Sequence, residues 1–133
     1  MGGITTFDTG NKDILLLKLD DRGDTLWSKT FGGTFNDESF CVEQSRDSGF
    51  VIAGYKSTAS SNMDFYFIKT NASGDQQWTP TYGGALKECN YSIIQTCDLG
   101  FAVCCYTGST GAGAKDMTLL KYNEGRNLVW QKT

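Results

Sequence analysis

The apolar positions of this chain fall into short runs that return at a regular distance along the sequence. The stretch Asp13–Gly33 (DILLLKLDDRGDTLWSKTFGG) returns as Asp64–Gly84 (DFYFIKTNASGDQQWTPTYGG) and again as Asp116–Thr133 (DMTLLKYNEGRNLVWQKT). The copies start 51 residues (64 − 13) and then 52 residues (116 − 64) apart. A period of about 50 residues is typical of solenoids and propellers, in which one supersecondary unit buries its apolar surface against its neighbours.

The start of each copy is apolar at nearly every position. Residues Asp13–Asp20 scarcely alternate, and Phe65–Ile68 and Met117–Leu120 are continuous apolar runs. Such a run predicts a β-strand that is covered on both faces, because a strand with one wet face alternates. We therefore expect each copy to begin with a strand in the middle of a sheet.

A hairpin is predicted to follow this strand. Asp20–Gly23 and Asn71–Gly74 have the form Asx-x-x-Gly, in which the Asx side chain caps the turn and the glycine takes a positive φ. The second strand of each hairpin carries a tryptophan, whose large apolar body is expected to anchor one sheet on the next. These second strands are Thr25–Phe31 with Trp27, Gln76–Tyr82 with Trp78, and Leu128–Thr133 with Trp130.

Two more strands complete each full copy. A Gly-Gly pair and a polar loop lead into a third strand, and an Asp-x-Gly turn leads into a fourth, which ends in a Ser- and Gly-rich linker. Pro80 falls inside a predicted strand, where its position must face solvent or form a bulge. No stretch has the helical period. The third strands are Phe40–Ser45 and Tyr91–Thr96, the fourth Phe50–Tyr55 and Phe101–Tyr106, the loops Thr34–Glu38 and Ala85–Asn90, and the linkers Ser57–Met63 and Thr107–Lys115.

The predicted fold class is all-β, with tandem four-stranded antiparallel units like the blades of a propeller. Four short antiparallel strands in about 50 residues are the content of one blade. The chain is predicted to be a single β-repeat array over residues 1–133, a partial ring of about two and a half repeats. Asp13–Met63 and Asp64–Lys115 are the predicted complete sheets, and residues 1–12 and 116–133 the incomplete units at the ends.

The repeated motifs carry a family resemblance. The pattern is Asp-(apolar)4-Lys, Asx-x-x-Gly, Leu-Trp, Thr-Phe/Tyr-Gly-Gly, Asp-x-Gly-Phe and Gly-Tyr. Over the whole chain it resembles the short β-propeller repeats of surface and secreted microbial proteins. The resemblance implies a toroid of blades, a non-catalytic role in adhesion, scaffolding or ligand display, no cofactor, and an extracellular or cell-surface location. The chain departs from the pattern at Cys105, which replaces the glycine found at Gly54, and in the third copy, which stops after two strands.

Charge and hydropathy argue against several classes of partner. The chain has 12 Lys and Arg against 15 Asp and Glu, a net charge of −3, and its basic residues are scattered. It therefore lacks the basic stripe typical of nucleic-acid binding. No apolar run approaches the roughly 18 residues of a membrane span, and residues 1–10 lack the regions of a signal peptide. The expected partners are a protein or glycan ligand, other propeller blades, or copies of the chain itself.

The cysteines do not predict a metal site. The chain has five cysteines, no Cys-x-x-Cys pair and no histidine, and no cysteine recurs between the copies. We interpret them as reduced residues packed in strands, with one or two disulfides in an oxidising compartment as the alternative.

The candidate ligand-binding residues lie in the loops after the double glycines. Alternating strand directions bring these loops and the linkers to one end of the sheets, which varies most between the copies. Acidic groups there are also compatible with Ca²⁺ or with acid–base chemistry, but the alternation of a calcium loop is missing and nothing makes the carboxylates converge. The predicted ligand-binding residues are Phe35, Asn36, Asp37, Glu38, Lys87 and Glu88, with no catalytic and no metal-binding residue.

Asp13, Asp64 and Asp116 recur in every copy, as do the lysines five residues after each of them. A residue present in each unit usually serves each unit. We therefore expect a structural role, for instance an aspartate that accepts backbone N–H bonds at the start of its strand.

The alternative function is a blade of a propeller enzyme, either a quinoprotein-like dehydrogenase or a glycan-active enzyme. The segment LLKLDDRGDTLWSKTFGG also resembles blades of pyrroloquinoline-quinone dehydrogenases, and Cys104–Cys105 is similar to the adjacent-cysteine disulfide beside their cofactor. That resemblance implies a complete ring and a calcium site, whereas Ala53 and Gly54 stand at these positions in the other copy. We therefore expect no enzyme activity.

A blade leaves apolar sheet on both flanks, and a ring covers each flank with the next blade. Two arrangements are open from the sequence. Either the chain is a piece of a longer propeller whose other blades cover Ile14–Leu19 and Leu119–Trp130, or copies of the chain associate through these flanks.

Overall fold

The computed structural model describes residues 2–8, 11–58, 62–80, 82–111 and 115–133, which form eleven strands in three antiparallel sheets. The prediction of an all-β antiparallel fold is confirmed. The first sheet contains β1 (Gly2–Asp8), β2 (Asn11–Leu19) and β3 (Thr25–Phe31), the middle sheet β4 (Asp37–Gln44), β5 (Phe50–Ser57), β6 (Met63–Thr70) and β7 (Gln76–Trp78), and the last sheet β8 (Glu88–Gln95), β9 (Phe101–Thr107), β10 (Asp116–Tyr122) and β11 (Leu128–Lys132).

The apolar strand that begins each copy lies inside its sheet, as its sequence predicts. Strand β2 pairs with β1 and β3, β6 pairs with β5 and β7, and β10 pairs with β9 and β11. Each of these strands has a hydrogen-bonded partner on both edges. The predicted cover on both faces holds for β6, whose residues Phe65–Ile68 are all buried. It does not hold for the two outer sheets, because Leu15 and Leu17 of β2 are half-buried and Met117 and Leu119 of β10 are exposed.

The Asx turns form as predicted. The Asp20 carboxylate accepts hydrogen bonds from the backbone N–H groups of Arg22 and Asp24, each at 2.9 Å, and Gly23 takes a φ of 89°. Gly74 takes a φ of 80° in the second copy. In the third copy Arg126 occupies this left-handed position, with a φ of 68°.

The predicted boundaries of the complete sheets are wrong by two strands. Strand β5 pairs with β6, which begins the next sequence copy, so the middle sheet runs from Asp37 to Trp78 and the last from Glu88 to Lys132. A tandem repeat has no natural starting point: four consecutive strands give the same sequence pattern wherever the count begins. The loop after each double glycine carries the chain to the next sheet, a step that the pattern does not mark.

Pro80 is predicted to fall inside a strand, but it lies outside one. Strand β7 ends at Trp78, which pairs with Lys69, and the chain rejoins β6 only at the bridge between Tyr82 and Phe65. The register places Pro80 opposite Phe67, and a proline has no N–H to donate to that strand's carbonyl. The outer strand of the middle sheet is therefore interrupted, whereas β3 pairs with β2 continuously from Phe31 to Trp27.

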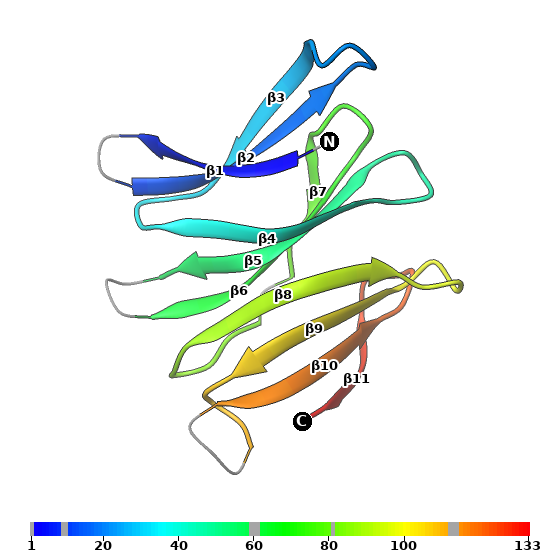
Figure 1. Cartoon of the computed structure of the whole chain (residues 1–133). Helices are drawn as coiled ribbons and strands as arrows, with labels where there is room; N and C mark the ends of the chain where they lie inside the picture. Colours follow the sequence, from blue (N-terminus) through cyan, green and yellow to red (C-terminus); the bar gives the residue numbers. More distant parts are fainter. Residues whose placement is uncertain (1, 9–10, 59–61, 81, 112–114) are drawn as a thin grey trace.

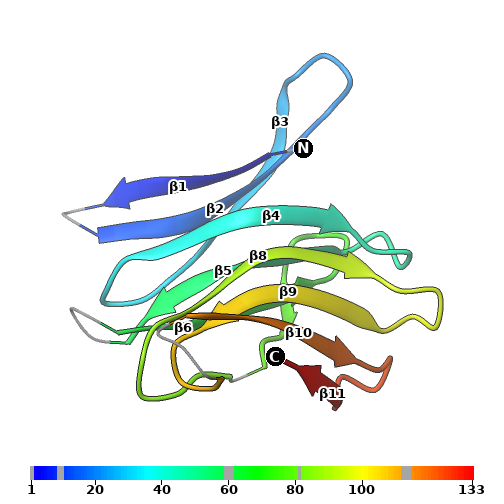
Figure 2. The same ribbon diagram turned by 60° about the horizontal axis from the view of Figure 1, so that its bottom comes forward.

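The three sheets are stacked face to face (Figure 1), with the first sheet at the top and the last at the bottom. Figure 2 shows that the sheets fan out while β4 and β8 remain side by side. Two apolar cores separate the layers. The core between the first and middle sheets contains Ile14, Leu16, Phe31, Phe50, Ile52, Tyr66 and Ile68, and the core between the middle and last sheets contains Val51, Ala53, Phe65, Phe67, Ile93, Phe101, Val103, Cys105, Leu120 and Tyr122.

Two of the recurrent tryptophans anchor one sheet on the next, as predicted. The Trp27 ring meets Phe50 edge-on at 5.6 Å between centroids, and the Trp78 ring meets Tyr122 edge-on at 5.5 Å. Trp27 and Trp78 each pack against an interlayer core. Trp130 lies on the outer face of the last sheet and is 42% exposed.

Candidate functional site

The longer connections gather at one end of the sheets and the short turns at the other (Figure 1), with the longer connections on the left of that view. One backbone hydrogen bond holds each loop against the linker of its own sheet. The N–H of Ser57 donates to the Asn36 carbonyl at 3.2 Å, and the N–H of Gly108 donates to the Lys87 carbonyl at 3.0 Å. The predicted loop end therefore exists in the described residues, although parts of both linkers, residues 59–61 and 112–114, lie outside them.

Two of the six candidate residues, Asp37 and Glu88, are fully buried. Asp37 accepts the N–H of Ser57 at 3.0 Å, and burial raises the pKa of its carboxyl. Glu88 accepts the N–H of Gly84 at 3.0 Å and bonds from Thr107 and Ser109. These carboxylates hold the loops in place from the inside.

The other four candidates are accessible, and two of them are joined by a lysine. The Lys12 ammonium forms an ion pair with Glu38 at 2.8 Å, and the Lys12 N–H donates to the Asn36 side chain at 2.9 Å. The hydrogen bond from Lys12 holds the pKa of Glu38 below its usual value. Phe35 and Lys87 are exposed on their separate loops. The structure thus brings Asn36 and Glu38 together and places Lys87 in the loop of the next sheet.

The recurrent lysines are part of the framework of their sheets. The Lys69 ammonium is nearly buried and donates to both carboxylate oxygens of Asp47, at 2.8 and 3.0 Å, and to the Thr70 carbonyl at 2.7 Å. Lys121 repeats these contacts with Asp98 and with the carbonyl of Tyr122, both at 2.9 Å. Lys69 and Lys121 therefore each tie their strand to the Asp-x-Gly turn of the same sheet, whereas the Lys18 ammonium lies 5.9 Å from the centroid of the Phe50 ring in the middle sheet.

The recurrent aspartates explain the double glycines. An ideal Cβ on Gly83 would lie 2.5 Å from the Asp64 carboxyl, and one on Gly32 would overlap the side chain of Asp13. The glycine leaves room for the aspartate that begins the neighbouring strand. Asp64 accepts a hydrogen bond from the Asn62 side chain, and burial, followed by the charge of Glu88, raises the pKa of its carboxyl.

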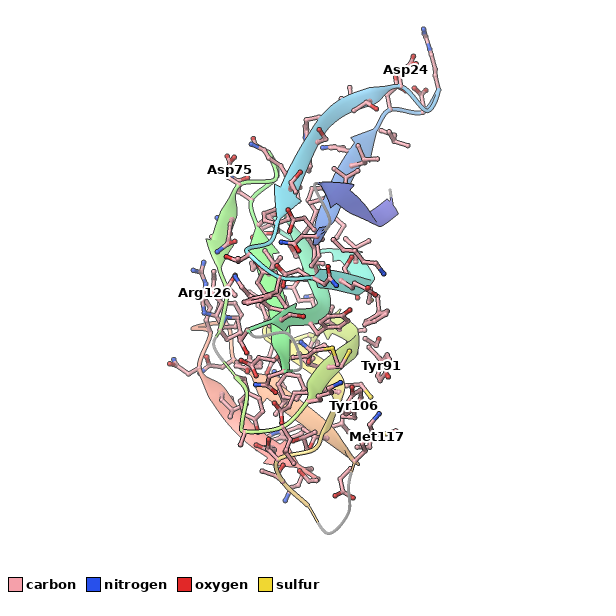
Figure 3. All side chains as sticks on the ribbon, turned by 90° about the vertical axis from the view of Figure 1, so that its left-hand side faces the viewer. Asp24, Asp75, Tyr91, Tyr106, Met117 and Arg126 are labelled. Atoms are coloured by element: carbon pink, nitrogen blue, oxygen red, sulfur yellow. The ribbon has the colours of Figure 1, made fainter. Side chains whose placement is uncertain are left out.

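A row of four aromatic rings lies along the strands at the opposite edge from β7 and β11. Neighbouring ring centroids are 6.0 Å apart for Tyr55 and Phe40, 5.5 Å for Phe40 and Tyr91, and 5.7 Å for Tyr91 and Tyr106. The Lys115 ammonium lies 4.8 Å from the centroid of Tyr106 and ends the row. Figure 3 shows Tyr91 and Tyr106 on this edge, away from Asp75 and Arg126. We call these four residues the aromatic row.

Two β-bulges turn the middle rings of the row outward. The pairing of β4 with β5 skips Phe40, and the pairing of β8 with β9 skips Tyr91. A bulge leaves one residue out of the ladder and redirects its side chain, and such bulges are frequent next to functional sites. Phe40 is 49% exposed and Tyr91 53% exposed, although large aromatic side chains favour burial.

The polar end of the row is tied to the loop end through Glu38. Burial and the hydrogen bond that Tyr55 donates to Glu38 raise the pKa of the tyrosine. Glu38 in turn pairs with Lys12. A continuous surface therefore runs from the Lys12–Glu38 pair over the four rings to Lys115.

Sequence reasoning missed the aromatic row because it assigned Phe40 and Tyr91 to ordinary alternating strands. A signal for the row does exist in the sequence. Phe40 and Tyr91 stand 51 residues apart, as do Tyr55 and Tyr106. The missing information is the bulge, which depends on how two strands pair and is not visible in the pattern of either one.

Hollows also lie elsewhere among the described residues. A groove of about 450 Å³ at the turn end is lined by residues of the middle and last sheets, and a hollow of about 250 Å³ opens beside the break at Pro80. The described residues contain no group of three or more side chains suited to a metal ion. None of the described segments is a helix long and apolar enough to cross a membrane. The five cysteines are free thiols, of which Cys89 and Cys105 are buried.

No family model matches the chain. The chain is similar to the regulatory protein FlaEY of Caulobacter vibrioides, with 29% identity over 89 residues. The match covers 56% of this chain and spans only 9% of the length of that protein.

Proposed function

We propose that this chain is a non-catalytic binding or scaffold module of the β-propeller repeat type. Its sheets act as blades, and the aromatic row with the adjoining loop end is its ligand-binding surface. The observation that carries the proposal is the exposure of Phe40 and Tyr91 on two equivalent bulges. Core packing needs no aromatic ring at an exposed bulge, so the repetition of the ring favours a role outside the fold.

The shape and chemistry of the row favour an extended, uncharged ligand, and we propose a neutral glycan chain. Flat rings spaced 5.5 to 6.0 Å apart offer successive apolar faces, and the hydroxyl groups of the tyrosines add polar contacts. The accessible charged groups named above lie at the ends of the row, the Lys12–Glu38 pair at one end and Lys115 at the other, while Asp37 and Glu88 are buried. A protein segment rich in proline also binds to rows of aromatic rings and is the other ligand class to test.

Affinity electrophoresis in gels that contain neutral polysaccharides tests the proposal. We expect retardation of the wild type and its loss in Phe40→Ala/Tyr91→Ala, because each lost ring removes about 1 kcal/mol of contact and the two together weaken binding roughly 30-fold. Val129→Ala, which removes an exposed apolar side chain from β11 at the opposite edge of the sheets, is the matched control and should behave as the wild type. Equal retardation of the double variant and the wild type would contradict the proposal. Binding of a proline-rich peptide without any glycan would change the ligand class but keep the site.

A further inference from the structure

The contact between the first and middle sheets defines how one sheet of this chain receives the next. On the first sheet, Trp27 and Lys29 face the turn between β6 and β7 of the middle sheet. An ideal Cβ on Gly74 would lie 2.7 Å from the Trp27 ring, and Lys29 forms an ion pair with Asp75 at 2.8 Å. The contact therefore has two halves, a tryptophan and a lysine on one sheet and a Gly-Asp turn on the other.

The last sheet carries its own copy of the tryptophan and lysine that receive the next sheet, and this copy contacts no further sheet among the described residues. Trp130 and Lys132 stand at the positions of Trp27 and Lys29, and both are exposed. The strand beside them exposes Met117 to 71% and Leu119 to 45%. The equivalent side chains of the other sheets, Ile14 and Leu16 in the first and Phe65 and Phe67 in the middle, are buried under the following sheet. We call Met117, Leu119, Trp130 and Lys132 the receiving face.

The first sheet carries its own copy of the Gly-Asp turn that rests on a preceding sheet, and this copy contacts no other sheet in the part of the chain that the structure describes. Gly23 and Asp24 stand at the positions of Gly74 and Asp75, both are exposed, and no side chain lies within 4 Å of an ideal Cβ on Gly23. On the same face of β2, Leu15 and Leu17 are half-buried and Leu19 is exposed. Their equivalents Tyr66, Ile68, Thr118 and Leu120 are buried against a preceding sheet. We call Leu15, Leu17, Leu19, Gly23 and Asp24 the inserting face.

The two faces lie at opposite ends of the stack, so one copy of the chain cannot join its own faces. Figure 3 shows Asp24 at the top and Met117 near the bottom. The apolar surfaces match in kind, and the charges match in sign: Lys132 on one face and Asp24 on the other reproduce the Lys29–Asp75 pair. At the contact between the middle and last sheets, Pro80 stands at the position equivalent to Lys29, so this ion pair cannot form there. The ion pair is therefore specific to the contact between the first and middle sheets.

We propose that the receiving face of one copy binds the inserting face of a second copy, in the same way as the first sheet receives the middle sheet. The two faces differ, so the contact is heterologous and each added copy leaves one face of each kind open. Association therefore continues beyond a dimer until a ring closes. The proposal does not depend on the ligand proposed for the aromatic row, because that row lies on another surface.

Sedimentation velocity across a concentration series, with charge-swapped variants, tests the ion pair. We expect wild-type oligomers that grow with concentration. Asp24→Lys and Lys132→Asp should each weaken association about 10-fold, because each juxtaposes two like charges. Asp24→Lys/Lys132→Asp should restore it to near the wild-type level. A double variant as weak as the single variants would overturn the pairing of these two residues.

A mixing experiment tests the head-to-tail geometry. Trp130→Asp blocks the receiving face and Leu19→Asp blocks the inserting face, so each variant alone should be a monomer. Mixed, they should form a 1:1 heterodimer and nothing larger, since only one intact face of each kind remains. Leu86→Asp, at an exposed apolar residue outside both faces, should assemble as the wild type does. A cooperative thermal unfolding transition in every variant would show that they fold, whereas the assembling variants should melt at higher temperature because association stabilises the folded state.

Two results would overturn the proposal. One is a folded wild type that stays monomeric up to about 100 µM, since a weaker contact is no specific interface. The other is a mixture of the two blocked variants that contains no heterodimer. Ligand binding measured on the monomeric Trp130→Asp variant keeps the test of the proposed function separate from this one.

Discussion

Gly74 and Gly23 stand at the same place in equivalent turns, but only Gly74 is packed under a tryptophan. Both have a positive φ, 80° and 89°. An ideal Cβ on Gly74 would lie 2.7 Å from Cζ3 of Trp27 and 2.8 Å from Cγ of Lys29, whereas Gly23 has open space around it. Replacing each glycine by alanine therefore separates the cost of the backbone angle from the cost of the sheet-to-sheet contact.

The expected magnitudes follow from these distances. A non-glycine residue in the left-handed region costs about 1 kcal/mol, and this cost is shared by both variants. Carbon atoms in contact are normally about 3.5–4.0 Å apart, so the new methyl group at Gly74 must push the Trp27 ring aside. Such overpacking costs about 1–3 kcal/mol. We expect Gly74→Ala to lower the free energy of unfolding by about 2–4 kcal/mol and Gly23→Ala by about 1 kcal/mol.

Urea unfolding followed by tryptophan fluorescence measures both losses. The two substitutions are made in the Trp130→Asp background, which keeps the chain monomeric, so that the open turn at Gly23 stays free of a second copy. Equal losses in the two variants would refute the reasoning, because they would show that the turn at Gly74 does not rest on the first sheet.

Three other predictions follow from single residues. Arg126→Gly should raise the free energy of unfolding by about 1 kcal/mol in the same assay, because it removes a side chain from a left-handed position. Partial burial raises the pKa of Asp47, but the bonds from Lys69 and its neighbours outweigh this and hold the pKa at about 2. The ordinary pKa of an aspartate is 3.8, so the stability that the Asp47–Lys69 pair contributes is complete above about pH 4. This stability is lost as the pH falls through 2. The difference between the wild type and Asp47→Asn should therefore shrink in acid unfolding below pH 4. Iodoacetamide followed by mass spectrometry should label exposed Cys97 in the folded protein and label Cys89 only on unfolding, because burial raises the pKa of the Cys89 thiol to about 12.

The sequence predicts local structure well and sheet membership poorly. Runs such as Phe65–Ile68 and turns such as Asn71–Gly74 determine their own conformation through nearby residues, so the strands and Asx turns form as predicted. Membership in a sheet depends on which strands pair. The repeat is compatible with any starting strand, and only the backbone pairing of β5 with β6 places the boundary before Asp37.

The candidate site is predicted only in part, for a similar reason. The loop end forms where the alternating strands place it, but polarity alone suggests that Asp37 and Glu88 face solvent. They are buried because the loops leave backbone N–H groups, such as those of Ser57 and Gly84, that need an acceptor inside the protein. Their burial leaves Phe35, Asn36, Glu38 and Lys87 as the members of the predicted set that a ligand can reach.

Recurrence and exposure together separate the residues that stabilise the sheets of this chain from the residues that are candidates for binding. Lys69 and Lys121 recur and are mostly buried, and their partners lie within their own sheet. Phe40 and Tyr91 also recur, but at each of them a bulge leaves half of the ring exposed. Trp130 is the third case: its equivalents are packed against a following sheet, whereas it lies exposed on the outer face of the last described sheet. A recurrent residue that is buried in one copy and exposed in another therefore marks a contact between sheets, whereas the exposure of Phe40 and Tyr91 in both of their copies is what supports the proposal of a surface for a different molecule.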